Sequence, residues 1–151
     1  GGQKTKPMKY LFLLLSVVSL ALPAAAAAND KIFKQVGDNK IFFSSFNSTF
    51  IEPDVAVANQ IVRGKDKGLV NIAVVVDSGT GKPAVITGNV YNIFQMSQTL
   101  EFVEVREQVA VYYLAPFEFE NEDFLTFKIS VRSDPKKPAY DFKFQKKMYH
   151  D

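Results

Sequence analysis

The sequence predicts an all-β protein, an immunoglobulin-like antiparallel β-sandwich of about eight strands with a short helix in the 48–68 connection. Composition is the first observation. Residues 29–151 contain 15 valines and 13 phenylalanines but only four leucines, and β-branched and aromatic side chains favour strands. Alternation is the second, because several segments place apolar side chains at every other position. Spacing is the third, since turn-forming residues recur roughly every 8–12 residues, as in β-sandwiches.

A secretory signal peptide is predicted over residues 8–28. Met8-Lys9 is a short basic start, Leu11–Leu22 is an apolar stretch of 12 residues, and alanines follow Pro23 as a signal peptidase requires. A transmembrane helix would need roughly 18 or more apolar residues, and Pro23 interrupts this run. Residues 1–7 precede Met8 and are interpreted as vector-derived sequence. We therefore expect a single domain over residues 29–151, with no stable membrane span after processing.

Charge and cysteine content limit the compartment and the partners. Residues 1–28 hold three of the 18 Lys and Arg and none of the 16 Asp and Glu, so residues 29–151 carry 15 basic and 16 acidic side chains. A domain with this balance is not expected to bind nucleic acid. The chain has no cysteine, whereas small secreted eukaryotic domains often carry disulfides. We expect a protein of the Gram-negative periplasm.

The first predicted strands cover 31–36 and 40–47, with a turn at 37–39. In the connection at 48–68, Pro53 suits the first position of a short helix that continues over 54–58. We interpret this connection as a strap that plugs one end of the sandwich with the apolar side chains of Phe50, Ile51, Val55 and Val57. The alternative is a functional loop, because long connections in compact domains often are.

The central strands are predicted from segments that are apolar on both faces. Leu69–Val76 is apolar throughout apart from Asn71, as a strand buried on both faces should be. The next strand, 84–94, also has large residues on both faces. Gly88 inside it indicates a bulge or a close approach of the neighbouring backbone.

The last four predicted strands are 99–106, 109–117, 124–132 and 140–148. In 124–132 the apolar side chains alternate with polar ones from Leu125 onward, which is the pattern of a half-buried strand. The strand at 140–148 alternates in the same way, except that Lys146 falls in the apolar row.

The residues do not support catalysis or a metal centre. His150, beside the C-terminus, is the only histidine, and there are no thiols, so zinc and copper sites lack their usual ligands. Histidine-based catalytic triads are excluded for the same reason unless His150 acts. The acidic residues at 118–123 lack the spacing of a calcium loop and are interpreted as a solvated turn. We expect a non-enzymatic protein without a cofactor.

The most unusual polar residues lie among the predicted strands. Glu104 and Arg106 share a strand face with Leu100 and Phe102, which places two charges in a row that begins as core. One interpretation is structural: Glu104 forms a buried pair with Arg106 or with Arg63, and asparagines satisfy backbone groups at strand ends. The other is a recognition patch. Its candidate binding residues are Asn47, Arg63, Glu104, Arg106, Tyr112 and Tyr113.

Several segments together resemble a known family. They are FNSTFIEP at 46–53, LVNIAV at 69–74, LEFVEVRE at 100–107, AVYYLA at 110–115 and FKFQ at 142–145. In this combination, from about residue 31 to the C-terminus, the chain resembles the exported Gram-negative family "domain of unknown function 4426". The resemblance implies a small periplasmic β-sandwich and implies no activity, cofactor or partner. Gln108-Val109 departs from the Gly-Asp type of turn expected after Glu107.

These observations favour a non-catalytic periplasmic binding or envelope-accessory module. Its partner would be a protein, peptide or glycan of the cell envelope. One alternative is an assembly factor or chaperone that uses an edge strand. The other is a small hydrolase of envelope polymers, which would need a concave site with convergent carboxylates.

Overall fold

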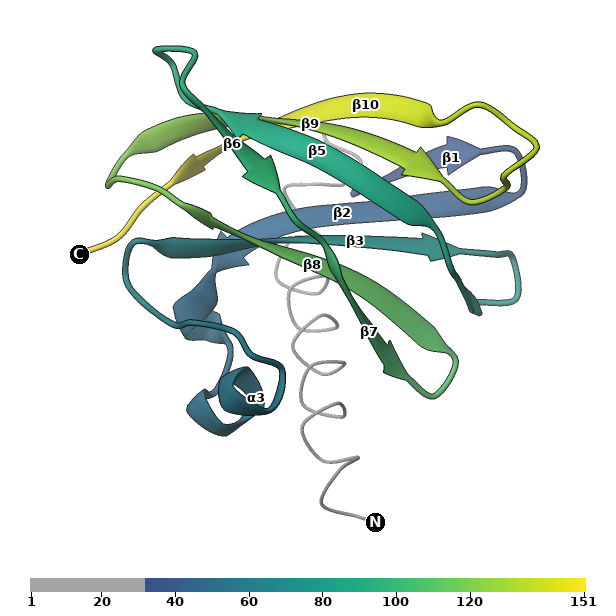
Figure 1. The fold of residues 1–151 in the computed structure, drawn as a ribbon, viewed down its shortest axis with the longest axis horizontal. Coiled ribbons are helices and arrows are strands. Elements are labelled where there is room, and N and C mark those ends of the chain that lie inside the picture. Colours follow the sequence, from purple (N-terminus) through teal and green to yellow (C-terminus); the bar gives the residue numbers. More distant parts are fainter. Residues whose placement is uncertain (1–31) are drawn as a thin grey trace.

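The computed structural model describes residues 32–151, and the predicted signal peptide lies outside the described residues. Ten antiparallel strands form two sheets that pack face to face (Figure 1). The prediction of an antiparallel β-sandwich is confirmed. No helix within residues 32–151 has the length and apolarity to cross a membrane.

Sheet A has the strand order β1-β2-β3-β8-β7, and the short β4 pairs with β3. Its strands are β1 (Phe33–Val36), β2 (Asn39–Asn47), β3 (Lys67–Val75), β4 (Gly81–Lys82), β7 (Val103–Glu107) and β8 (Ala110–Glu118). Sheet B has the order β10-β9-β5-β6. Its strands are β5 (Val85–Tyr91), β6 (Ser97–Leu100), β9 (Asp123–Arg132) and β10 (Tyr140–Met148).

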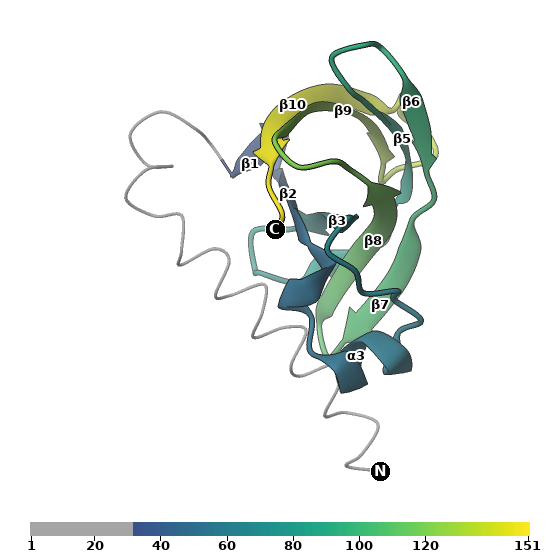
Figure 2. The same cartoon turned by 90° about the vertical axis from the view of Figure 1, so that its left-hand side faces the viewer.

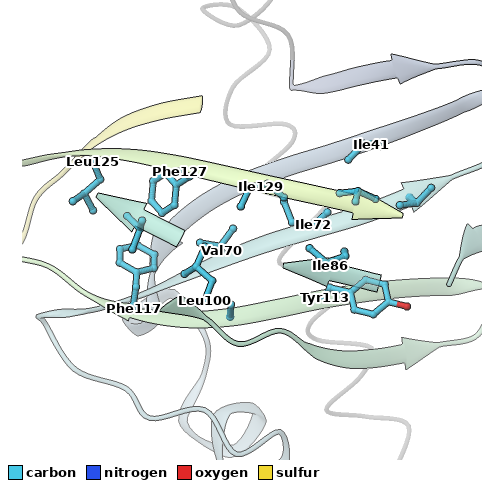
Figure 3. Packing of buried hydrophobic residues seen from close by; sticks show 14 of the residues in the cluster. Ile41, Val70, Ile72, Ile86, Leu100, Tyr113, Phe117, Leu125, Phe127 and Ile129 are labelled. Carbon is cyan, nitrogen blue, oxygen red and sulfur yellow. The ribbon is translucent and has the colours of Figure 1, made fainter. Parts of the chain in front are cut away.

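The main core lies between the two sheets, as Figure 3 shows. Sheet A contributes the inward row of β3, which includes Val70 and Ile72, and sheet B contributes Phe127 and Ile129 of β9. Phe127 is fully buried and lies 5.2 Å from Phe117, centroid to centroid, in an edge-on contact. The alternating apolar residues recognised in the sequence therefore form the inner faces of both sheets.

The 48–68 connection covers the outer face of sheet A instead of plugging an end of the sandwich. It contains the 3₁₀ helix η1 (Ser48–Phe50) and the helix α3 (Pro53–Ala58), which begins at Pro53 as predicted. Ile51 and Val55 are buried against Leu69 in a second apolar cluster. Phe50 and Val57, however, are 58% and 79% exposed, so their assignment to the plug was wrong.

One predicted strand is divided between the sheets. The segment expected as a single strand at 99–106 forms β6 in sheet B and then β7 in sheet A, and the chain crosses between the sheets at 101–102. Figure 2 shows this side of the sandwich, where the chain descends from β6 to β7. The crossing carries Glu104 and Arg106 onto β7, which is an edge of sheet A.

Gly88 allows a close approach within sheet B, as the sequence indicated. It lies opposite Ile129 on one side and Leu100 on the other. A Cβ atom at this position would lie 2.6 Å from the carbonyl oxygen of Lys128. No side chain larger than a hydrogen atom fits there without a backbone shift.

Candidate functional site

Three of the six predicted site residues form one network on the inner side of β7 and β8. Arg106 Nε donates to Glu104 Oε1 at 2.5 Å, and the Tyr113 hydroxyl donates to Glu104 Oε2 at 2.8 Å. The same hydroxyl accepts a hydrogen bond from the backbone N–H of Ala84 at 2.9 Å. The network therefore connects the edge strand β7 to β8 and to the segment that leads into β5.

The Glu104–Arg106 pair is exposed, so the interpretation of a buried ion pair was wrong. The side chains of Glu104 and Arg106 are 38% and 58% exposed, because β7 lies at the rim of the sandwich. The hydrogen bonds from Arg106 and Tyr113 lower the pKa of the Glu104 carboxyl. Burial, more than its contact with Glu104, raises the pKa of the Tyr113 hydroxyl. Exposed pairs of this kind contribute little to stability.

Tyr112 lies on the opposite face of sheet A from Tyr113, as adjacent residues of a strand must. It is 3% exposed and packs with Leu114, Val105 and Ala73 in the second apolar cluster. Its hydroxyl has no hydrogen-bond partner. Burial and the nearby Glu107 carboxyl raise the pKa of the Tyr112 hydroxyl.

Asn47 and Arg63 have structural contacts outside the Glu104 network. The Asn47 side chain donates to the carbonyl oxygen of Tyr149 at 2.8 Å, which ties the end of β2 to the C-terminal segment. Arg63 Nη2 donates to the carbonyl oxygen of Thr49 at 3.2 Å, within the 48–68 connection. The six predicted residues therefore do not form one patch.

A different surface, which was not predicted from the sequence, is hollowed into an open groove. This groove, of about 650 Å³, lies on sheet B, around Gly88. Because Ile86, Val90 and Ile129 point into the core, their neighbours along the strands point outward. The polar residues that line the groove are Thr87, Asn89, Thr99, Lys128, Ser130, Asp141 and Lys143.

The groove is lined by hydroxyl and amide groups on β5, β6 and β9 and by two lysines on β9 and β10. Asn89 Nδ2 donates to Thr99 Oγ1 across β5 and β6, although this hydrogen bond is long at 3.4 Å. Lys128 and Lys143 face each other across β9 and β10. The Lys128 ammonium also lies 4.7 Å from the centroid of the Tyr91 ring, a distance typical of a cation–π contact. Asp141 is the single carboxylate among the lining residues.

The signal for this groove was present in the sequence as outward-facing polar residues on neighbouring strands. Thr87 and Asn89 on β5 alternate with core residues, and so do Lys128 and Ser130 on β9. Each pair on its own resembles an ordinary solvated strand face. Only the pairing of β5, β9 and β10 brings the three polar rows together.

No group of three or more His, Cys, Asp or Glu side chains that could hold a metal ion occurs in residues 32–151. The acidic turn at 118–123 includes a hydrogen bond from the Glu120 backbone N–H to Asp123 Oδ2 at 3.1 Å. The Glu118 carboxylate pairs with Lys67. Glu118, Glu120 and Glu122 are exposed, as expected for acidic residues of a solvated turn, whereas Phe119 between them is buried in the core.

Comparison with known proteins gives a family and a fold. The family model described as domain of unknown function DUF4426 matches residues 33–151. The crystal structure of a DUF4426 family protein from Pseudomonas aeruginosa is 33% identical, with a TM-score of 0.70, over 79% of this chain and 94% of that chain. No curated protein matches the sequence.

More distant structures share the fold alone. FetP of a uropathogenic Escherichia coli strain, expressed in the periplasm, is 10% identical with a TM-score of 0.54, over 78% of this chain and 93% of that chain. A copper-bound variant of FetP is 9% identical with a TM-score of 0.53, over 78% and 94% of the two chains.

Proposed function

The chain belongs to the DUF4426 family of domains of unknown function, and from its surface we propose that it is a non-catalytic periplasmic module that binds a glycan of the cell envelope. The binding surface in this proposal is the groove on the outer face of sheet B. That groove is the observation that carries the proposal.

The chemistry of the groove suits a hydroxyl-rich ligand. Threonine and serine hydroxyls and the Asn89 amide can each donate and accept hydrogen bonds, as sugar hydroxyls also do. Lys128 and Lys143 add positive charge, which favours a glycan that carries carboxylate or phosphate groups. The open shape exposes the ligand to water on one side, so we expect weak to moderate affinity.

A hydrolytic role has less support than binding. Glycoside hydrolysis uses a pair of carboxylates on either side of the scissile bond. Among the residues that line the groove, Asp141 is the single carboxylate. The protein is therefore proposed to bind its ligand without cleaving it.

The edge-strand chaperone also has less support. β10, with nine residues, is the long edge of sheet B, but it carries Lys143, Lys146 and Lys147. Lysines on an edge strand hinder pairing with another strand. Lys146 lies in the inward row, its ammonium donates to the carbonyl oxygen of Ser45, and burial lowers its pKa.

The periplasmic location in the proposal has two supports, the predicted signal peptide and the fold shared with FetP, which was expressed in the periplasm. The copper bound by the FetP variant gives no support for a copper site in this groove. That protein shares the fold alone, and the groove lacks histidine and methionine side chains.

The proposal can be tested by an NMR titration of the ¹⁵N-labelled protein with soluble peptidoglycan fragments and with lipopolysaccharide core oligosaccharides. We expect chemical-shift changes in β5, β9 and β10 with at least one of these probes. Lys128→Gln combined with Lys143→Gln should weaken binding of an acidic glycan about tenfold. Lys65→Gln, in the exposed turn before β3, is the matched control for the loss of a surface lysine and should leave binding unchanged.

Chemical-shift changes confined to β7 and β8 would indicate binding at the Glu104 network and would contradict the proposal that the groove is the binding site. An absence of saturable shift changes with both classes of oligosaccharide would reject the glycan ligand.

A further inference from the structure

The loop between β5 and β6 exposes three large apolar side chains within four residues. Ile93, Phe94 and Met96 are 63%, 76% and 63% exposed. In Figures 1 and 2 this loop extends beyond the rest of the sandwich, above the ends of β5 and β6. We refer to residues 92–96 as the apolar tip.

Hydrogen bonds hold the apolar tip in one conformation. The Asn92 side-chain oxygen accepts from the backbone N–H groups of Phe94 and Met96 at 2.9 and 3.0 Å. The Asn92 backbone N–H donates to the carbonyl oxygen of Met96 at 3.0 Å, and the N–H of Gln95 donates to the carbonyl oxygen of Asn92 at 3.0 Å. Gln95 has a φ of +64°, which costs energy for a residue with a side chain. The fold therefore maintains a conformation that presents apolar side chains to the outside.

The hairpin that carries the tip has no charged residue. The sequence from Pro83 to Leu100 contains no Asp, Glu, Lys, Arg or His, although charged residues are common on protein surfaces. An uncharged hairpin can leave water without the large cost of desolvating an ion. This property suits a segment that enters a nonpolar or interfacial environment.

Two features favour lipid over a protein partner. A stable protein–protein interface buries at least about 1,200 Å² in total, which three side chains on one projecting loop do not provide. A lipid bilayer, in contrast, needs no complementary shape and accepts apolar side chains on a projecting element.

Amphipathic side chains lie next to the tip on the outer face of sheet B. Lys128 lies over the ring of Tyr91, the last residue of β5, and tyrosine and lysine are typical of the boundary between lipid and water. The pairing of Tyr91 with Thr126 places Phe124, 42% exposed, two residues nearer the tip. Acidic residues in the turn at 120–123 offset the lysines, so charge contributes less than apolar insertion.

We propose that the apolar tip inserts into the surface of a lipid bilayer and attaches the protein peripherally to a membrane of the envelope. This proposal does not depend on the ligand assigned to the groove. Insertion of the tip would place the adjoining ends of β5 and β6 at the membrane surface.

The absence of tryptophan from the chain allows a local test with the full-length protein. Phe94→Trp introduces a single tryptophan at the tip. Phe50→Trp is the matched control, because Phe50 is also an exposed aromatic residue, at 58%. It ends η1, shortly before α3, and α3 lies far from the β5–β6 loop in Figure 1. Each variant is mixed with vesicles of phosphatidylethanolamine and phosphatidylglycerol, and separately with phosphatidylcholine vesicles that contain brominated chains.

We expect the emission of the Phe94→Trp protein to shift to shorter wavelength with vesicles and to be quenched by the brominated chains. The Phe50→Trp protein should show neither change, even if another part of the chain binds lipid. Adding Ile93→Ser and Met96→Ser to Phe94→Trp should lower the apparent partition coefficient at least about tenfold. Equal thermal melts of the variants would show that the fold is retained.

Unchanged emission of the Phe94→Trp protein with both kinds of vesicle would overturn the proposal. Equal quenching at both positions would also overturn it, since insertion would then not be specific to the tip. A shift that appears with periplasmic proteins but not with vesicles would show instead that the tip binds a protein.

Discussion

Tyr112 and Tyr113 are neighbours in the sequence with opposite environments. The Tyr113 hydroxyl has two hydrogen-bond partners, whereas the Tyr112 hydroxyl is buried without one. A buried hydroxyl that lacks a partner costs about 1–3 kcal/mol. The two tyrosines should therefore respond differently to removal of the hydroxyl.

We expect Tyr112→Phe to leave stability unchanged or to raise it by about 1 kcal/mol, and Tyr113→Phe to lower it, as measured by chemical denaturation.

The Tyr112 hydroxyl should also make the stability of the protein depend on pH under alkaline conditions. The folded-state pKa of the Tyr112 hydroxyl is raised above its ordinary value of 10.0. Tyr112 therefore does not lower stability by ionising below pH 10, but the free energy of unfolding falls as the pH rises above 10, because the unfolded chain then loses this proton more readily than the folded one. Tyr112→Phe should reduce the alkaline loss of stability. An equal loss of stability at alkaline pH in the wild type and in Tyr112→Phe would contradict the attribution of that loss to Tyr112.

Gln108 occupies a backbone conformation that suits glycine. The φ of Gln108 is +53°, whereas the φ of Val109 is not positive. A type II′ hairpin turn has this combination at its two central residues, with the positive φ at the first of them. This is the position where the sequence departs from the Gly-Asp type of turn expected for the family. The departure therefore places a side chain where the backbone favours none.

Gln108→Gly should stabilise the protein by about 0.5 kcal/mol, because relief of the left-handed strain exceeds the added entropy of the unfolded chain. Val109→Gly is the control and should destabilise, since Val109 gains nothing from the change in conformation. Denaturant midpoints of the two variants would measure both effects. A loss of stability in Gln108→Gly would contradict the strain at this turn.

The crossing between β6 and β7 explains why a row that begins as core contains the charged residues Glu104 and Arg106. Leu100 is core in sheet B, whereas Glu104 lies on β7 at the rim of sheet A. The alternation continues through the crossing while the environment changes from core to solvent. A charged pair in this row is therefore compatible with the fold.

We expect Glu104→Ala and Arg106→Ala each to change the denaturation midpoint only slightly, because the pair is exposed and screened by solvent. The folded-state pKa of Glu104 is lowered, so its contribution is present above the ordinary carboxyl pKa and is lost as the pH falls through the lower folded value. Glu104→Gln should therefore weaken the acid dependence of stability. A large loss in either alanine variant that is recovered by replacing both residues with apolar ones would restore the buried-pair interpretation.

Sheet B depends on Gly88 for the distance between β5 and β9. In Gly88→Ala the new methyl group would meet the Lys128 carbonyl oxygen and the Ile129 side chain, at 2.6 and 2.9 Å. Overpacking of this kind typically costs about 1–3 kcal/mol. Gly64→Ala is the matched control, because there the nearest atom, at 3.0 Å, belongs to the flexible Lys67 side chain. Equal denaturation midpoints for the two variants would show that sheet B can adjust.

Export of the protein stays a prediction, because the signal peptide lies outside the described residues. The order of basic start, apolar run, proline and alanines in residues 8–28 predicts that about 20 residues after Met8 are removed. Intact-mass measurement of protein from a periplasmic extract should show this loss. A full-length species in the membrane fraction would contradict cleavage.

Local patterns in the sequence predict most of the strands, the helix at Pro53 and the position of Gly88 as a bulge or close approach, but not β4 or the division of 99–106 into β6 and β7. These features depend on local properties: the two-residue period of a strand, the fixed φ of proline and the missing side chain of glycine. The DUF4426 resemblance added agreement over nearly the whole domain.

Which strands share a sheet, and which surfaces this creates, follows from the tertiary structure. Alternation shows that Tyr112 and Tyr113 face opposite ways, but it does not show that the row containing Glu104 leaves the core at β7. The groove likewise requires β10 beside β9 and β9 beside β5, although β5 and β10 are separated by more than forty residues. Strand pairing over such distances depends on the packing of the whole core, which no local pattern in the sequence contains.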